Sequence, residues 1–164
     1  MLLIYYSGHA EGDSLELTGT TLEFGALRRF LENSKVDIRL AFIDSCHSGK
    51  LISARGATRG PAYEIKVADA ISSSGYAIIT SSAQNELSQE SRALRGAYFT
   101  HHLSSALRGS ADSTGDGVVT LQEAYKYAYS KTLAQTVASL GASQHPMYHF
   151  ELKGRGEIIL THTR

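Results

Sequence analysis

The single cysteine of the sequence, Cys46, stands in a setting that suits a nucleophile. The motif Asp44-Ser45-Cys46-His47-Ser48-Gly49 follows an apolar run, and Ser7-Gly8-His9 follows another. A thiol that attacks an amide needs a general base within hydrogen-bond reach and backbone N–H donors for the oxyanion that forms. We interpret Cys46 as a candidate nucleophile and His9 as its candidate base. The backbone N–H groups of Cys46 and Ala10 are then the candidate oxyanion donors.

The elements that precede the two motifs are expected to bring them together. Residues Leu2 to Tyr6 predict a strand buried on both faces, Thr21 to Glu32 predict an amphipathic helix, and Ile38 to Ile43 predict a second strand. A strand, helix, strand crossover makes the two strands parallel, so both motifs leave the carboxyl edge of one sheet. Taken alone, a lone Cys and a His at strand ends are more often packing residues, and that alternative stays open at this point.

The rest of the chain predicts a single α/β domain with a mostly parallel sheet. At 164 residues it can bury roughly 70% of its unfolded surface in one core. The further predicted elements are an exposed loop from Ser48 to Pro61, a strand from Tyr76 to Thr80, helices from about Ala97 to Leu107 and from Leu121 to about Leu140, and a terminal strand or hairpin from Tyr148 to Leu160. Gly109 and Gly141 are the expected helix stops.

Composition excludes several classes of function. The 16 basic and 16 acidic residues cancel and form no basic block, so we expect no nucleic-acid partner. A single cysteine forms neither an internal disulfide nor a thiolate zinc cluster. There is no apolar run near the roughly 18 residues that span a bilayer and no signal-peptide pattern. We expect no membrane partner and a cytoplasmic location by default, although a longer parent protein could be exported.

The two motifs carry a family resemblance. Tyr5-Tyr6-Ser7-Gly8-His9 and the motif from Asp44 to Gly49 resemble the His and Cys motifs of caspases and metacaspases, the peptidase C14-like proteins. Bacterial caspase-domain proteins are similar further along the chain, at Thr80-Ser81-Ser82, Gln89-Glu90-Ser91, Phe99-Thr100-His101-His102, Leu107-Arg108-Gly109 and Gln144-His145-Pro146. The resemblance implies a caspase-like three-layer sandwich and a cysteine endopeptidase that acts on polypeptides and requires no cofactor. Residues 1–50 then resemble a large subunit, 51–62 an exposed loop, and 63–164 a small subunit.

Two departures from the family pattern bear on these expectations. Ala10 stands where the family more often has Gly, and its methyl group narrows the approach to the oxyanion site. Two strands with their helices precede the His strand in the caspase fold, so we expect an N-terminally truncated chain, with a missing segment or a partner strand at the edge from Leu2 to Tyr6. A catalytically inactive caspase-fold module that binds partners therefore remains an alternative.

Charge near Cys46 predicts the substrate preference. Asp44 stands where metacaspases carry Asp and where caspases that prefer acidic residues carry Gln. Glu86 resembles the second acidic position of the metacaspase pocket. Together the two carboxylates would bind Arg or Lys immediately before the scissile bond. Arg55 and Arg59 lie in the loop where relatives are cut between subunits, which makes them candidates for self-cleavage, with an unprocessed, solvated loop as the alternative.

A separate motif suggests calcium. Residues Asp112 to Glu123 fit the twelve-residue loop of an EF-hand, and helices are predicted on both sides. The ligands would be Asp112, Thr114, Asp116, the Val118 carbonyl, Thr120 and a bidentate Glu123. Thr120 and Glu123 also form a capping box for the helix that begins at Leu121, which explains the glutamate without a metal. A calcium-responsive module is thus a further alternative.

Overall fold

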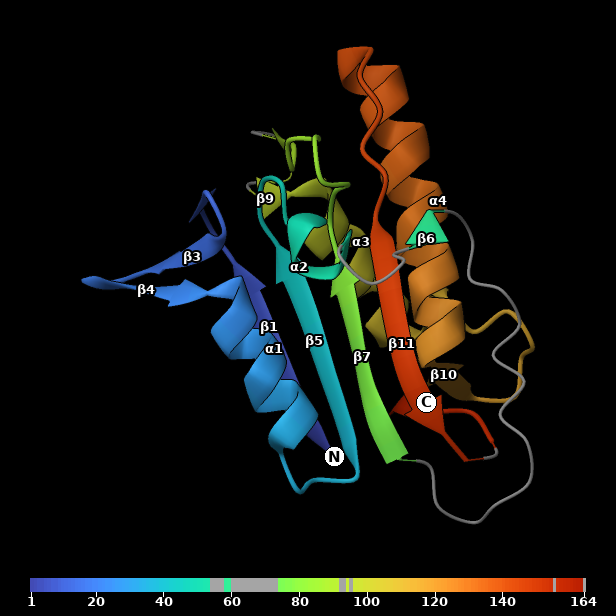
Figure 1. The fold of residues 1–164 in the computed structure, drawn as a ribbon. Helices are drawn as coiled ribbons and strands as arrows, with labels where there is room; N and C mark the ends of the chain where they lie inside the picture. Colours follow the sequence, from blue (N-terminus) through green and yellow to red (C-terminus); the bar gives the residue numbers. More distant parts are fainter. Residues whose placement is uncertain (54–57, 60–73, 92–93, 95, 155, 164) are drawn as a thin grey trace.

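One five-stranded sheet forms the centre of the computed structural model, which describes residues 1–53, 58–59, 74–91, 94, 96–154 and 156–163. The strand order is β1 (Leu2–Ser7), β5 (Ile38–Asp44), β7 (Ser74–Thr80), β11 (Met147–Lys153) and β6 (Thr58–Arg59) (Figure 1). Strands β1, β5 and β7 are parallel, whereas β11 runs antiparallel to both β7 and β6. The predicted α/β class with a mostly parallel sheet is confirmed.

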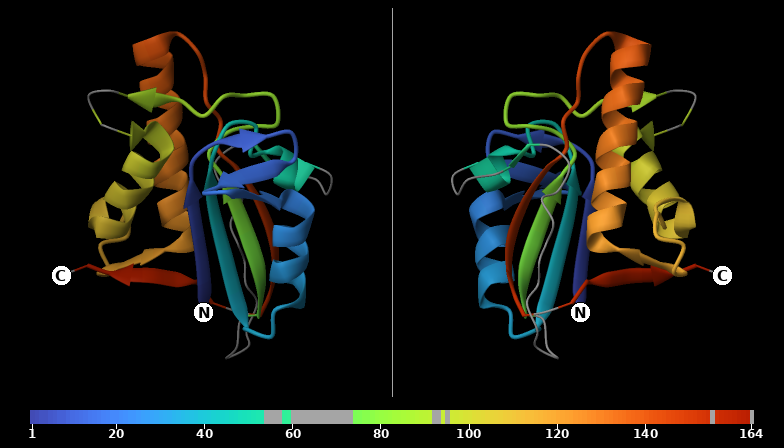
Figure 2. Two further views of the ribbon diagram at one scale, coloured as in Figure 1. Left: turned by 90° about the vertical axis from the view of Figure 1, so that its left-hand side faces the viewer. Right: turned by 90° about the vertical axis from the view of Figure 1, so that its right-hand side faces the viewer.

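Helices cover the two faces of this sheet and make three layers (Figure 2). One face packs against α1 (Phe24–Asn33) and α2 (Lys50–Ser53), and the other packs against α3 (Tyr98–Ser105), the π-helical turn η1 (Ala106–Ser110) and α4 (Leu121–Leu140). Successive side chains of β5 alternate between the layers, since Leu40 and Phe42 pack toward α3 and α4 while Ala41 and Ile43 pack toward α1. The sheet core is therefore apolar on both sides.

The helix ends follow the signals expected from the sequence. Thr120 and Glu123 form a reciprocal capping box at the start of α4, and Gly141 ends it in the left-handed conformation with φ 64°. Gly109 has φ 111° and interrupts the helical path after α3. No helix in the described part of the chain is long and apolar enough to cross a membrane.

Strand β1 differs from its prediction as a strand buried on both faces. Its residues are alternately half-buried and exposed, and Leu3 and Tyr5 are each 47% exposed. The reason is that β1 is an edge strand of the described sheet. Ile4 and Tyr6 pack against the α1 layer, whereas the cluster under α3 and α4 takes its residues of the main sheet from β5, β7 and β11. An apolar run in the sequence does not reveal which of its faces is covered.

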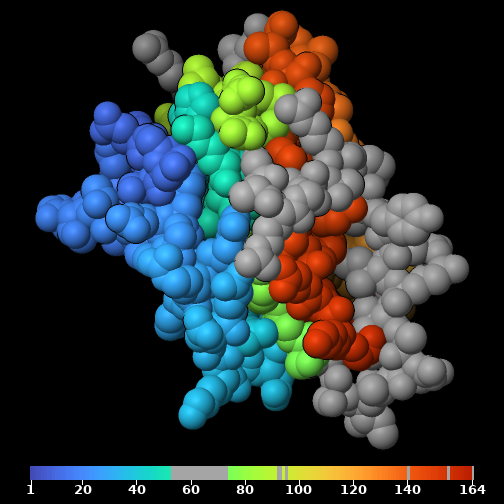
Figure 3. Space-filling model, in the orientation of Figure 1, coloured from blue at the N-terminus to red at the C-terminus, as the bar shows by residue number. Residues whose placement is uncertain are grey.

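The start of the first helix was predicted too early. Residues Thr20–Glu23 form β4, the last strand of a small antiparallel sheet with β2 (Ala10–Glu11) and β3 (Ser14–Leu17), and α1 begins at Phe24. This sheet projects as a lobe beside the main body (Figure 3). The predicted exposed loop also begins too early, because Leu51 and Ile52 in α2 are each only 1% exposed and pack into the α1 layer.

The C-terminal region contains strands, as the prediction of a terminal strand or hairpin expected, but these strands do not pair with each other as a hairpin. Strand β11 joins the main sheet, while β12 (Ile159–His162) pairs with β10 (Val118–Thr120) in a separate two-stranded sheet. A further pair, β8 (Glu90–Ser91) and β9 (Gly96–Ala97), leads into α3. These short strands have too few residues to show a period in the sequence.

Candidate active site

The two predicted catalytic motifs leave neighbouring parallel strands in register. Ser7 at the end of β1 pairs with Asp44 at the end of β5, and His9 and Cys46 each lie two residues beyond that pair. The backbone N–H of Gly8 donates to the carbonyl of Asp44 at 3.0 Å, so the contact between the two segments continues past the last paired residues. Neighbouring strands lie about 4.8 Å apart. The expectation that both motifs emerge at one sheet edge is therefore confirmed.

The backbone of His9 is held by two donors. The Tyr6 hydroxyl lies 2.6 Å from the His9 carbonyl oxygen, and the Glu16 N–H donates to the same oxygen at 3.0 Å. Gly8 makes the tyrosine contact possible, because a Cβ at this position would lie 2.7 Å from the Tyr6 hydroxyl oxygen. The His9 residue itself is exposed. Its backbone is thus fixed while its side chain stays accessible.

The Tyr6 hydroxyl stays protonated and can therefore donate a hydrogen bond at neutral pH. It also lies 2.7 Å from the Glu16 carbonyl, so it links the end of β1 to the small sheet. Burial raises the pKa of Tyr6, and the nearby charge of Glu16 raises it further, against a smaller opposite effect of the backbone hydrogen bond. The phenol therefore keeps its proton at neutral pH.

Cys46 lies in a tight turn between β5 and α2, and it is partly buried. Its Sγ faces the Ser88 carbonyl oxygen at 3.9 Å. The next residue, His47, has φ 56°, which is uncommon for a residue other than glycine, and its N–H donates to the Glu86 carbonyl at 3.0 Å. The turn is therefore held in an unusual backbone conformation by the loop that follows β7.

The same loop packs closely against the rest of the turn. The hydroxyls of Ser81 and Ser82 donate to the Ser45 carbonyl at 3.4 and 3.2 Å. A Cβ at Gly49 would lie 2.5 Å from the Gln84 nitrogen, so no side chain fits there without movement of the loop backbone. Glycine at position 49 is thus required by packing.

Asp44, the predicted specificity residue, is 2% exposed and accepts several hydrogen bonds. The Ser88 hydroxyl donates at 2.6 Å to one carboxylate oxygen, and the Thr100 N–H donates at 3.2 Å to the other, which the Thr100 hydroxyl also contacts. Thr100 lies in the first turn of α3, where unpaired N–H groups and the helix dipole favour an anion. In the described part of the chain, no Lys or Arg forms an ion pair with Asp44.

Glu86, the second predicted specificity residue, is directed toward the segment that precedes β11. One of its carboxylate oxygens lies 2.8 Å from His145 Nδ1. The other accepts from the His145 N–H at 2.8 Å and from the Ala83 N–H at 3.3 Å. The structure therefore places both predicted carboxylates around the loop after β7, but it gives them different partners.

The two arginines predicted as cleavage positions are placed differently. Arg55 lies outside the described residues. Arg59 belongs to β6, and its backbone pairs with Met147 at the edge of the main sheet. A protease needs an extended segment that is free of its own sheet, so cleavage after Arg59 would require β6 to detach.

In the predicted calcium loop, the carboxylates of Asp112 and Asp116 accept hydrogen bonds from backbone N–H groups of the same loop. Asp112 accepts from the N–H groups of Gly115 at 2.8 Å and Gly117 at 3.1 Å, and Asp116 accepts from that of Val118 at 3.0 Å. The Thr114 hydroxyl lies 3.5 Å from Asp112. Among the described residues, no group of three or more His, Cys, Asp or Glu side chains is arranged to hold a metal ion.

Glu123 closes this loop by bonds to both of its ends. One carboxylate oxygen accepts from the N–H and hydroxyl of Ser113 at 3.1 and 3.0 Å, and the other accepts from those of Thr120, both at 3.1 Å. Burial acts to raise the pKa of Glu123, but these hydrogen bonds together outweigh it and leave the pKa below its ordinary value. The charged carboxylate is therefore stabilised in the folded state without a cation.

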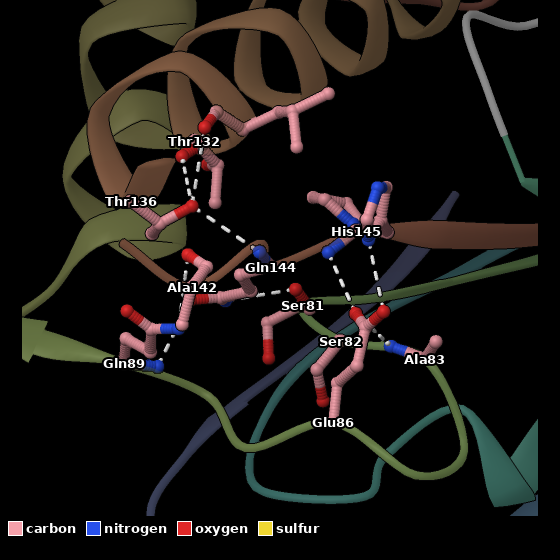
Figure 4. A network of polar contacts seen from close by, with 12 residues as sticks. Ser81, Ser82, Ala83, Glu86, Gln89, Thr132, Thr136, Ala142, Gln144 and His145 are labelled. Carbon is pink, nitrogen blue, oxygen red and sulfur yellow. Dashed lines mark hydrogen bonds and ion pairs between the residues drawn. The ribbon is translucent and has the colours of Figure 1, made fainter. Parts of the chain in front are cut away.

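Sequence reasoning assigned no role to Ser88, Gln144 or His145, although each contacts the loop or residues around Cys46. Gln144 is fully buried, and its side-chain amide donates to the Ser81 carbonyl at 2.8 Å and accepts from the Gln89 N–H at 2.9 Å (Figure 4). The signals in the sequence were the family resemblance at Gln144-His145-Pro146 and, for Ser88, a run of polar residues after the strand that ends at Thr80. These signals do not identify hydrogen-bond partners that lie more than fifty positions away in the sequence.

Comparison with known proteins gives consistent matches. A family model described as "Caspase domain" matches residues 1–154. Among solved structures, the crystal structure of caspase-1 from Spodoptera frugiperda is similar, with a TM-score of 0.57 and 16% sequence identity. The match covers 99% of this chain and 63% of that chain, and at this identity the likeness concerns the fold alone. No curated protein matches the sequence.

Proposed function

Because this chain belongs to the caspase domain family, we propose that it is a cysteine endopeptidase in which His9 and Cys46 form the catalytic dyad. The observation that carries the proposal is the register of β1 and β5, which sets both residues two positions beyond one strand pair. The hydrogen bond from Gly8 to Asp44 ties the two segments together at this point. The single cysteine of the chain is thus next to the segment that carries an exposed histidine.

The reaction divides into two steps. The imidazole of His9 takes the proton of the Cys46 thiol, and the sulfur attacks the carbonyl carbon of the scissile peptide bond. The carbon–nitrogen bond then breaks, the proton passes to the leaving amine, and a thioester remains on Cys46. Water, with His9 as base, attacks that thioester and releases the acid product, which returns the thiol to its starting state.

The N–H of Ala10 suits the role of an oxyanion donor. The Glu16 N–H donates to the His9 carbonyl, and Ala10 pairs with Leu15 next along the two strands. Because hydrogen-bonded and non-bonded pairs alternate in an antiparallel ladder, the Ala10 N–H points away from β3. The Ala10 N–H can therefore donate a hydrogen bond to the oxyanion, together with the Cys46 N–H.

Asp44 supports a preference for Arg or Lys before the cleaved bond. Its carboxylate is buried and accepts hydrogen bonds from hydroxyl and N–H donors, and among the residues that the structure describes it forms no ion pair with a Lys or Arg side chain. A basic substrate side chain at the surface above it would complement that charge. Ser88 and Thr100 lie between the Asp44 carboxylate and such a substrate side chain, so the two charges attract each other at a distance. Direct contact between the substrate cation and Asp44 would require Ser88 or Thr100 to move.

The test compares fluorogenic peptides that end in Arg, Lys or Asp on the native chain and on Cys46→Ala. We expect cleavage after Arg and Lys only, and no turnover in Cys46→Ala. In Asp44→Asn, which keeps an acceptor for Ser88, cleavage after Arg should fall while the folded state persists. Equal background rates in the native chain and Cys46→Ala would instead favour the inactive interaction module.

A further inference from the structure

The loop from Ser81 to Gln89 lies between the Cys46 turn and the segment from Ala142 to Pro146, which connects α4 to β11. Figure 4 shows its far side, where the Glu86 carboxylate points toward His145 and the Ser81 carbonyl oxygen faces the Gln144 side chain. The near side contacts the nucleophile turn through backbone and hydroxyl groups. The loop is thus the part through which the connecting segment can act on Cys46.

Glu86 contacts both sides of this arrangement. Its carbonyl oxygen accepts the N–H of His47, the residue with positive φ directly after the nucleophile. Its carboxylate accepts the N–H of His145 and lies 2.8 Å from the His145 ring nitrogen. Glu86 therefore joins His145, through its carboxylate, to the peptide unit between Cys46 and His47, through its carbonyl oxygen.

The connecting segment is itself firmly anchored. The N–H of Gln144 donates to the Thr136 hydroxyl at 3.2 Å, and that hydroxyl donates to the Thr132 carbonyl at 2.9 Å within α4 (Figure 4). The buried Gln144 side chain holds Ser81 and Gln89, the two ends of the loop. Movement of the loop would break these buried hydrogen bonds, which is costly.

We propose that Glu86 is a positioning residue for Cys46, and that its pairing with His145 fixes the loop that holds the nucleophile turn. The proposal rests on the proposed function, in which Cys46 is the nucleophile. It replaces the role expected from the sequence, where Glu86 binds the basic side chain of the substrate. The carboxylate is directed to His145 and to the Ala83 N–H, and the Glu86 side chain is 19% exposed.

The experiment uses Glu86→Ala, Glu86→Gln and the control Glu90→Ala, which removes an exposed carboxylate from the residue that directly follows the loop. Three properties are measured on the full chain: hydrogen exchange at residues 45–49, the rate of Cys46 alkylation by iodoacetamide, and kcat and KM for peptides with Arg or Lys. Because iodoacetamide is small and neutral, its reaction rate depends on the position and accessibility of the Cys46 thiol and not on binding in a substrate pocket.

In Glu86→Ala we expect faster exchange across the Cys46 turn, a changed alkylation rate, and a loss of kcat of roughly tenfold that is equal for Arg and Lys peptides. Glu86→Gln keeps one acceptor oxygen and should recover part of this loss, and Glu90→Ala should match the native chain. His145→Asn, which keeps a side-chain donor, should be milder than His145→Ala. These two variants test the pairing even where Glu86→Ala fails to fold.

A substrate-binding Glu86 would give a different result. KM would then rise for basic peptides in both Glu86 variants, while exchange and alkylation remained as in the native chain, and that outcome would overturn the proposal. Failure of the proposed function is distinguishable, because the native chain and Cys46→Ala would then show equal rates with every peptide. Hydrogen exchange and alkylation would still report in that case whether the pairing of Glu86 with His145 holds the Cys46 turn.

Discussion

Gly8 donates its backbone N–H to the carbonyl of Asp44 across 3.0 Å, and this bond joins the segment that carries His9 to the strand that leads to Cys46. The two residues lie just at the carboxyl ends of β1 and β5. Open parallel sheets bind ligands at this edge. The proposed dyad therefore depends on backbone pairing rather than on a contact between long side chains.

Replacement of Tyr6 by Phe tests how the His9 segment is held. The variant loses the hydroxyl that contacts the carbonyls of His9 and Glu16, so we expect a loss of about 1 kcal/mol in the free energy of unfolding. We also expect a lower kcat with little change in KM, because the base is misplaced while the substrate contacts remain. Urea denaturation and steady-state kinetics measure the two effects. An unchanged kcat beside reduced stability would show that the hydroxyl is structural only.

Replacement of Gly49 by Ala tests the packing of the Cys46 turn against the loop after β7. The added Cβ would lie 2.5 Å from the Gln84 nitrogen, and we expect a destabilisation of about 1–3 kcal/mol together with slower turnover. Gly96→Ala is the matched control, since a Cβ there meets no atom within 4 Å. Thermal unfolding compares the two variants. Equal stability of both would contradict the close approach at position 49.

Calcium tests the loop from Asp112 to Glu123. Bidentate binding by Glu123 would require its carboxylate to leave the Ser113 and Thr120 donors, so we expect no heat of binding at about millimolar calcium. Isothermal calorimetry on the native chain makes this measurement. A one-to-one binding isotherm that disappears in Asp112→Asn would restore the calcium-responsive alternative.

His102 makes stability depend on pH. It is buried between α3 and α4 with Nε2 2.7 Å from Gln135, and burial lowers its pKa below the ordinary 6.5; the charges of His101 and Lys131 add to this, and the bond to Gln135 opposes it. As the pH falls through 6.5, the unfolded chain takes up a proton before the folded chain does, so the free energy of unfolding falls. The fall ends once the pH is below the folded-state pKa.

The measurement for His102 is urea denaturation at about pH 7.5 and about pH 5.5. The native chain should lose more stability between the two conditions than His102→Gln, which has no proton to gain. Equal losses would mean that His102 is as accessible to protons in the folded state as in the unfolded state.

Much of the fold could be predicted because its main elements leave strong local patterns. The apolar runs before Ser7 and Asp44, the helical spacing between them, and the capping box at Thr120 are all short-range signals. The parallel orientation of the two strands followed from the crossover alone, whereas their register is known only from the structure. These patterns were sufficient to place His9 and Cys46 at one edge of the sheet.

The exposure of β1 and the partners of Glu86 could not be predicted in the same way. Leu3 and Tyr5 are apolar, and only the arrangement of the layers shows that their face is partly open. Glu86 was expected to bind the substrate, but its carboxylate contacts His145 in the segment between α4 and β11. A single sequence carries no record of such long-range pairing, so the specificity role was assigned by resemblance.

The most direct test of the dyad labels the nucleophile itself. A peptidyl acyloxymethyl ketone with Arg next to the ketone should modify Cys46, identified by mass spectrometry, and His9→Ala should slow this reaction by roughly a hundredfold or more, since base catalysis contributes on that order. Labelling of another residue, or of Cys46 at the same rate in both proteins, would contradict the pairing of His9 with Cys46.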